Sequence, residues 1–118
     1  MADVRPLNSL RYDLEKVGAL ADVVSPPYDV IDAALREELL GRSPFNVVEV
    51  DLPQPYEEIG RGEGDPYARA AETVAAWKAE GALIDDPEPA LWALTQDYTA
   101  PDGSTNTRHG ILARVRVE

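Results

Sequence analysis

The sequence contains no cysteine, a single histidine and no long apolar run. The absence of cysteine excludes disulfides, thiol catalysis and metal sites built on thiolates. A metal site with several histidine ligands is excluded as well, since His109 is the only histidine. No stretch approaches the roughly 20 apolar residues of a membrane-spanning helix, and the first residues lack the pattern of a signal peptide. These features predict a soluble cytoplasmic protein with no metal site and no membrane partner.

Positive charge is also scarce, because 11 basic residues stand against 22 acidic ones and the formal net charge is −11 at pH 7. Such a chain does not neutralise phosphates over a wide surface, so binding to nucleic acids or to an anionic membrane is not expected. A local excess of positive charge occurs only near the C-terminal end, at Arg108, His109, Arg114 and Arg116. A small anionic ligand or a nucleotide is the partner class that this pattern leaves open.

The most unusual segment is residues 24–31, which contains two consecutive prolines. The prolines fix two φ angles near −65° and remove two N–H donors, so the segment cannot be a helix interior or a central strand. Apolar residues on both sides predict that the core holds it as a rigid turn. The turn would present three polar side chains, those of Ser25, Tyr28 and Asp29. The structural alternative is a turn in which Asp29 or Asp32 only caps the following helix.

Caps and apolar spacing predict two helices. The first covers residues 32–41, with Asp32 as its N-cap, Gly41 as its C-cap and a stripe of leucines towards the core. The second covers residues 65–81 and begins with an aspartate N-cap followed by proline. We expect it to pack on a sheet, with Trp77 as a core anchor. Its apolar face carries Tyr67, Ala70, Ala71, Val74 and Trp77.

Three segments alternate in the manner of strands: residues 45–52, 90–99 and 108–118. The last two are joined by a turn and predict an antiparallel hairpin. Residues 90–99 carry bulky side chains on both faces, which favours a central strand. In the last strand, the side chains expected to face the core are Ile111, Ala113, Val115 and Val117.

The other segments carry weaker signals. Residues 1–13 read as an extended arm with Val4, Leu7 and Leu10 inward and its charged residues on solvated surface, and residues 14–24 show helical spacing that Gly18 weakens. Residues 53–65 form a long acidic loop whose glycines do not have the spacing of a nucleotide-binding motif. The acids of residues 85–89 are interpreted as a solvated turn, not a metal site.

The expected fold is therefore α+β: two main helices packed on a mostly antiparallel sheet, in a single domain over residues 1–118. The strand alternation is unbroken at Glu118. On this pattern we expect the sheet to be incomplete at its C-terminal end, and the chain to be the N-terminal fragment of a longer protein.

Arg108 and His109 begin the last predicted strand opposite Gln96 and Tyr98, an arrangement that suits binding of a phosphate or carboxylate. The alternative is cross-strand pairing of the arginines with Asp97 and Glu118. A hydrolase is not favoured, because Ser25 lacks nucleophile-elbow spacing and a triad would have to use the one histidine.

Several motifs resemble one bacterial and archaeal family, an uncharacterised conserved family named domain of unknown function 1015. They run through nearly all 118 residues in order, and the most specific is Pro26-Pro27-Tyr28-Asp29-Val30-Ile31, preceded by Ser25 where alanine is common. The others are Arg5-Pro6-Leu7, Leu10-Arg11-Tyr12, Pro44-Phe45-Asn46, Tyr67 with Trp77, Gly81-Ala82-Leu83, Gln96-Asp97-Tyr98 and Arg108-His109-Gly110.

The resemblance implies a longer protein with a later His-Glu-containing motif that has no counterpart here. The family is similar to a fold group that includes chromosome-partitioning-nuclease-like and sulfiredoxin-like proteins and kinases that act on free serine. This implies the N-terminal half of a phosphoryl-transfer enzyme, with the catalytic acid elsewhere.

Three functional hypotheses follow. In the first, the chain is part of a small-molecule enzyme of unknown cofactor whose pocket is lined by Arg11, Tyr28, Asp29, Gln96, Arg108 and His109. Asp29 would then orient a substrate hydroxyl or amine, and Arg108 would hold an anionic group. In the second, the same pocket binds an anion without chemistry. In the third, the chain is a folding and interaction domain whose exposed strand edge pairs with the remaining part of a longer protein or self-associates with another copy.

Overall fold

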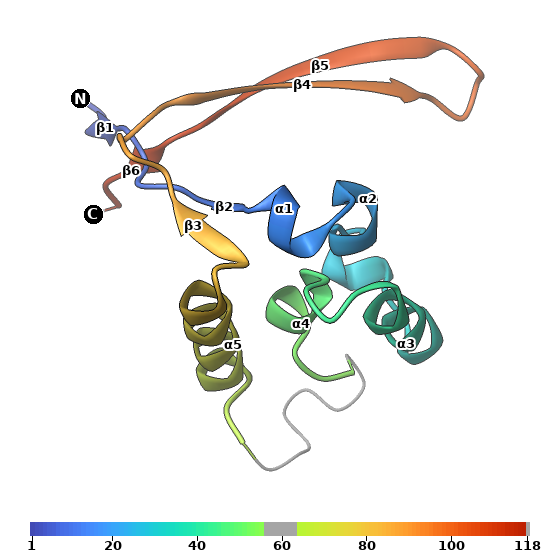
Figure 1. Ribbon diagram of the computed structural model, residues 1–118. Helices are drawn as coiled ribbons and strands as arrows, with labels where there is room; N and C mark the ends of the chain where they lie inside the picture. The colour runs from blue at the N-terminus through green and yellow to red at the C-terminus, as the bar shows by residue number, and fades with distance from the viewer. Residues whose placement is uncertain (56–63, 118) are drawn as a thin grey trace. The chain divides into compact units, whose positions relative to one another are not determined.

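The computed structural model describes residues 1–55 and 64–117 (Figure 1). Most of the acidic loop, including nearly all of its glycine-rich part, and Glu118 lie outside the described residues. The chain divides into two compact units, which we call the central unit (Arg11–Ile84) and the terminal unit (Met1–Leu10 together with Asp85 onward). Helices and antiparallel strands are both present, so the predicted α+β class is confirmed.

The central unit contains the helices of the described chain. They are α1 (Leu14–Val17), α2 (Leu20–Val23), the 3-10 turn η1 (Tyr28–Val30), α3 (Ala33–Arg42), α4 (Val48–Asp51) and α5 (Pro66–Glu80). Gly18, at a φ of +85°, ends α1 and separates it from α2, which explains the weakened helical pattern of that segment. The η1 turn follows the two prolines, and Val23 and Ile31 on its two sides are buried. Val24 and Val30, which were also expected to be held by the core, are exposed, so the core holds the segment only in part.

The two longer helices begin where the sequence predicts. The Asp32 carboxylate accepts a hydrogen bond from the Leu35 N–H at 2.8 Å, so Asp32 is the N-cap of α3. Asp65 caps α5 in the same way, and Gly81 ends that helix with a φ of +81°. The predicted C-cap at Gly41 is wrong, because α3 continues through it to Arg42 and Ser43 is the capping residue.

The core lies in the central unit. Ile31, Leu39, Val48 and Leu52 form a buried cluster, and Leu35 and Leu40 pack against it. Trp77, with 6% of its surface exposed, is the buried residue of α5 and confirms the predicted core anchor. Its ring contacts Tyr12 at a centroid distance of 6.2 Å and Phe45 at 5.9 Å.

The predicted strand at residues 45–52 is wrong, because this segment contains the short helix α4. The Asn46 side chain accepts a hydrogen bond from the Val48 N–H at 3.0 Å and so stabilises the turn that starts the helix. Val48 and Leu52 are both buried. Positions i and i+4 lie on one side of a helix, so the same apolar spacing suits a helix as well as a strand.

The helix α5 lies beside α4, which corrects the expectation that it packs on a sheet. Tyr67, near its start, is exposed and does not belong to its buried face. The strands β2 (Leu10–Tyr12) and β3 (Leu83–Asp85) form a two-stranded sheet, and the division between the two units falls within these strands. In the central unit, the Asp13 N–H donates to the Ala82 carbonyl at 2.9 Å.

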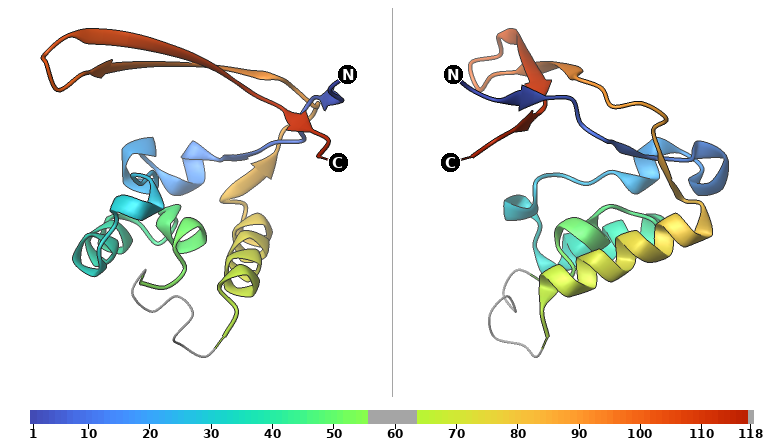
Figure 2. Two further views of the ribbon diagram at one scale, coloured as in Figure 1. Left: turned by 180° about the vertical axis from the view of Figure 1, so that it is seen from behind. Right: turned by 90° about the vertical axis from the view of Figure 1, so that its left-hand side faces the viewer.

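The terminal unit consists of strands and connecting segments. Strands β1 (Val4–Arg5) and β6 (Arg114–Val115) pair antiparallel, and Leu7 forms an isolated antiparallel bridge with Ala90. Strands β4 (Trp92–Thr99) and β5 (Thr105–Leu112) form the predicted hairpin, with Trp92 opposite Leu112 and Thr99 opposite Thr105 (Figure 2). We refer to this hairpin as the ribbon.

The ribbon is exposed on both faces. Ile111 is 74% exposed, and Val115 and Val117 are also exposed, so the expectation that they face a core is wrong. The expectation of a central strand at residues 90–99 is also wrong, since among the described strands β4 and β5 pair only with each other. Val4 and Leu10, predicted to point inward, are exposed as well. No described residue of the terminal unit is buried.

Candidate functional site

The seven predicted site residues belong to different units. Arg11, Ser25, Tyr28 and Asp29 lie in the central unit, and Gln96, Arg108 and His109 lie in the terminal unit. The predicted convergence of Tyr28 and Asp29 with Arg108 therefore stays a prediction.

Within the central unit, the predicted residues do not line a single hollow. Tyr28 lines a mainly apolar groove of about 470 Å³ with Leu52, Pro66 and Tyr67 among its other residues. Arg11 lines a different cleft, beside Tyr12 and Leu14. Asp29 is exposed in η1, and the Ser25 hydroxyl donates a hydrogen bond to the Pro26 carbonyl at 3.2 Å.

On the ribbon, Arg108 and Gln96 are direct cross-strand partners. The Arg108 Nε and Nη2 groups donate to the Gln96 Oε1 at 3.0 and 2.5 Å. Neighbouring residues of a strand point to opposite faces, so His109 lies on the other face, where its Nδ1 is 3.3 Å from the Thr95 hydroxyl. Arg108 and His109 therefore do not form one cluster, and the Arg108 guanidinium already has a neutral partner.

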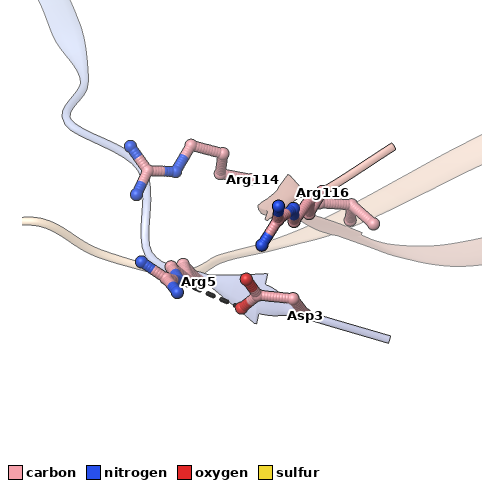
Figure 3. A pocket seen from close by; sticks show the side chains of 5 residues that line it. Asp3, Arg5, Arg114 and Arg116 are labelled. Carbon is pink, nitrogen blue, oxygen red and sulfur yellow. Dashed lines mark hydrogen bonds and ion pairs between the residues drawn. The ribbon is translucent and has the colours of Figure 1, made fainter. Parts of the chain in front are cut away.

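A different cluster of arginines lies on the β1–β6 strand pair. Arg5 stands directly opposite Arg114, and the Arg116 N–H donates to the Asp3 carbonyl at 3.0 Å, one step further along the pair. Residues two apart on a strand share a face, so these four side chains lie on the same face. Figure 3 shows the four charged side chains around a cleft of about 320 Å³.

The charge at this cleft has the opposite sign to that of the whole chain. Three guanidinium groups and one carboxylate line it, which gives a formal charge of +2 (three minus one). The Arg5 Nε donates to the Asp3 Oδ1 at 2.9 Å. Among the described residues, neither Arg114 nor Arg116 makes an ion pair. Like charges directly opposite in a strand pair are destabilising, so the Arg5–Arg114 pair has a cost that a bound anion would offset.

Sequence reasoning identified only part of this cluster. The positive charge of Arg114 and Arg116 is visible in the sequence, but the predicted anion site is at Arg108 and Arg5 is expected on solvated surface. The available signal was the alternation of Asp3 with Arg5 and of Arg114 with Arg116 on segments at the two ends of the chain. That alternation gives the shared face only once the register between β1 and β6 is known.

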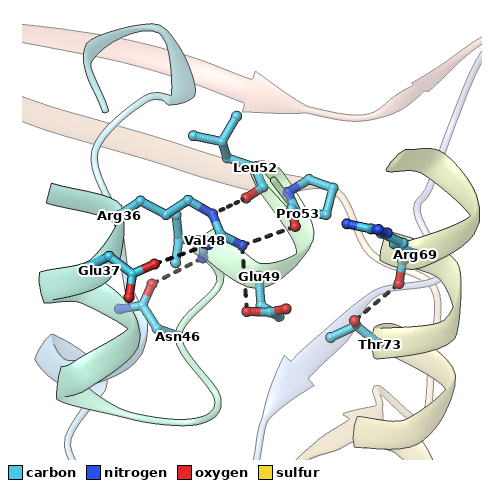
Figure 4. A network of polar contacts seen from close by, with 9 residues as sticks. All are labelled: Arg36, Glu37, Asn46, Val48, Glu49, Leu52, Pro53, Arg69 and Thr73. Atoms are coloured by element: carbon cyan, nitrogen blue, oxygen red, sulfur yellow. Dashed lines mark hydrogen bonds and ion pairs between the residues drawn. The ribbon is translucent and has the colours of Figure 1, made fainter. Parts of the chain in front are cut away.

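The buried cation of the central unit, Arg36, has a structural role (Figure 4). It is 8% exposed, and its guanidinium donates to the carbonyls of Leu52 at 2.8 Å and Pro53 at 3.0 Å. Glu37 and Glu49 lie 3.8 and 3.9 Å from it. Because its donors are engaged by the backbone that follows α4, Arg36 ties this segment to α3 and is not a candidate for ligand binding.

The Tyr12 phenol is part of the same core. Its hydroxyl donates to the Phe45 carbonyl at 2.6 Å, and burial raises the pKa of Tyr12 to about 12. The phenol is therefore a neutral structural donor at physiological pH.

None of the helices in the described part of the chain is both long and apolar enough to cross a membrane. No curated protein and no solved structure matches the chain. The model of one family, described as "Protein of unknown function (DUF1015)", matches residues 4–118, and the match covers the N-terminal portion of the family domain. Since the match extends over nearly the whole sequence, the chain belongs to this DUF1015 family.

Proposed function

We propose that this chain is a ligand-binding domain that holds a small anionic molecule on the arginine face of the β1–β6 pair. The observation that carries the proposal is the presence of Arg5, Arg114 and Arg116 on one face, with a single carboxylate between them. We call these three residues the arginine cluster. Arginine presents a planar fork of donors that matches phosphate and carboxylate oxygens, so the cluster suits both kinds of anion.

The surrounding charge supports a specific site over a general anion-binding surface. The whole chain carries −11, so anions are repelled at a distance and are attracted only where positive groups gather. The energetic cost of the Arg5–Arg114 pair also favours a ligand, because a bound anion turns a repulsive pair into two charge-assisted hydrogen-bonding partners.

The phosphoryl-transfer hypothesis, with Arg11, Tyr28, Asp29, Gln96, Arg108 and His109 around one pocket, is the alternative. It is less favoured for this chain because, within the central unit, Arg11 and Tyr28 line different hollows. The resemblance places the catalytic acid of such an enzyme outside residues 1–118, so the test is incubation of a full-length protein that contains this domain with ATP and free serine. Formation of phosphoserine would support the enzyme hypothesis over simple binding.

Calorimetric titration with inorganic phosphate at low salt tests the binding proposal. We expect Arg114→Gln to weaken phosphate binding at least tenfold, because a bidentate charged partner is lost. Arg42→Gln is the matched control: it removes the same charge from an exposed residue of the central unit, paired with Glu38 at 2.7 Å, and should change the affinity less than twofold.

The variant Arg108→Gln tests whether phosphate binds at the ribbon instead of at the arginine cluster. Loss of phosphate binding in Arg108→Gln, with Arg114→Gln unaffected, would overturn the proposal and place the anion beside Gln96. Equal losses in Arg114→Gln and Arg42→Gln would also overturn it, since binding would then depend only on net charge. Circular dichroism of each variant checks that the fold is retained.

A further inference from the structure

We infer that the ligand of the arginine cluster carries two phosphoryl groups, as in a diphosphate or in the bisphosphate ester of a small polar molecule. This inference rests on the proposed function and specifies its ligand class.

The positions of the three arginines indicate two separate points of anion contact. Arg5 and Arg114 stand opposite each other, at a Cα separation of about 5 Å for such a pair. Arg116 is two residues further along β6, about 6.8 Å from Arg114 at the usual strand rise. One phosphate group bound in the fork of Arg5 and Arg114 therefore leaves the Arg116 guanidinium for a second group.

Asp3 makes the two contact points unequal. It stands opposite Arg116, but its carboxylate is bonded to the Arg5 Nε at 2.9 Å, so it neutralises part of the first point. The terminal amino groups of Arg5 remain on the guanidinium fork for a ligand, since the bond to Asp3 uses Nε. Among the described residues no ion pair neutralises Arg116, so a second anionic group is attracted there.

The size and lining of the cleft restrict the rest of the ligand. The cleft is open to solvent and has a volume of about 320 Å³, so it has room for more than one phosphoryl group. Its described lining consists of Asp3, the arginine cluster and Val115, with no aromatic ring on which a base would stack. These properties favour a small hydrophilic diphosphate or bisphosphate over a nucleotide.

Calorimetric titrations with inorganic phosphate and with pyrophosphate, at equal ionic strength and with a chelator present, test the inference. We expect pyrophosphate to bind at least tenfold more tightly than phosphate. Arg116→Gln should reduce this preference to threefold or less while it changes the phosphate affinity less than twofold. Arg116→Lys should keep part of the preference, because the charge remains and only the fork of donors is lost.

The outcomes distinguish the ligand class from the site itself. Equal affinity for phosphate and pyrophosphate would overturn the two-phosphoryl inference and leave the anion site in place. A pyrophosphate preference that survives in Arg116→Gln would also overturn it, since the preference would then come from ligand charge alone. If neither ion binds, the proposed function fails together with the inference. The Arg42→Gln variant is again the control for net charge.

Discussion

The central and terminal units are stabilised in different ways. All the buried side chains of the described residues belong to the central unit, including Leu39, Val48 and Trp77. The terminal unit is held by backbone pairing of β1 with β6 and of β4 with β5, and none of its described apolar side chains is buried.

Because of this difference, variants of the two units are expected to change different properties of the protein. Burial of apolar surface is the main favourable contribution to folding, and a two-stranded hairpin alone is marginally stable. The candidate anion site lies in the unit that lacks buried side chains, on a short strand pair. Variants of the central unit should therefore affect the free energy of unfolding, and variants of the terminal unit should affect binding.

The largest effect on stability is expected for Trp77→Ala. The indole is 6% exposed and contacts the rings of Tyr12 and Phe45, so its removal should lower the free energy of unfolding by about 3–5 kcal/mol. Urea denaturation followed by circular dichroism measures this loss. The matched variant is Trp92→Ala in the terminal unit, where the indole is 42% exposed and donates to the Ser9 hydroxyl at 2.8 Å. It should cost about 1 kcal/mol, and equal costs for the two tryptophans would contradict the comparison.

A smaller loss, about 2 kcal/mol, is expected for Arg36→Met. The change keeps an unbranched apolar side chain but removes the donors to the Leu52 and Pro53 carbonyls. The hydrogen bond to Leu52 is buried, so its carbonyl is left without this partner away from solvent. The control is Arg42→Met, which breaks an exposed helix pair with Glu38 and should cost less than about 0.5 kcal/mol. A neutral or stabilising result for Arg36→Met would show that the buried guanidinium costs as much to desolvate as its hydrogen bonds return.

The third effect depends on pH. Burial raises the pKa of Tyr12 to about 12, so above pH 10 the unfolded chain releases this proton before the folded one does. The associated stability is complete below pH 10 and is lost as the pH rises from 10 towards 12. Two pH units correspond to about 2.7 kcal/mol, and because the phenol is only half buried, screening by solvent should leave on the order of 1 kcal/mol.

Urea unfolding of the wild-type chain and Tyr12→Phe at pH 8 and pH 11 measures this contribution. The variant loses the hydrogen bond to Phe45 at both pH values, and it should show a smaller fall in stability between them. An equal fall in both proteins would assign the alkaline loss to other groups.

The sequence was sufficient to predict the elements whose signals are local. An aspartate N-cap followed by proline and a terminal glycine define α5, and the turn between β4 and β5 is stabilised by hydrogen bonds from Ser104 to the Asp102 carboxylate. Such features depend on neighbouring residues, so a single sequence contains them. The same holds for Trp77, whose size and position on an amphipathic helix predict burial.

The errors occurred where a pattern fits two structures or depends on distant residues. The valines and leucine of residues 48–52 satisfy both strand alternation and the i, i+4 spacing of a helix, and the Asn46 side chain decides for the helix. The arginine cluster requires the register between Arg5 and Arg114, which are more than a hundred residues apart. The alternation of side chains along β4 and β5 also indicates which residues share a face of the ribbon, but it does not show whether either face is buried.

The smallest effect is expected on the ribbon, where Leu94→Ala should change the free energy of unfolding by less than about 0.5 kcal/mol. Leu94 is 42% exposed, whereas Leu39, the matched leucine of the core, is 1% exposed, and Leu39→Ala should cost about 2–5 kcal/mol. Urea denaturation of both variants makes the comparison. A large cost for Leu94→Ala would mean that something covers the ribbon in solution. The strand edge predicted to self-associate would then be the first candidate, because a strand with unpaired backbone groups accepts another chain. Sedimentation velocity at increasing protein concentration would show the dimer, and Leu94→Ala would shift it towards monomer.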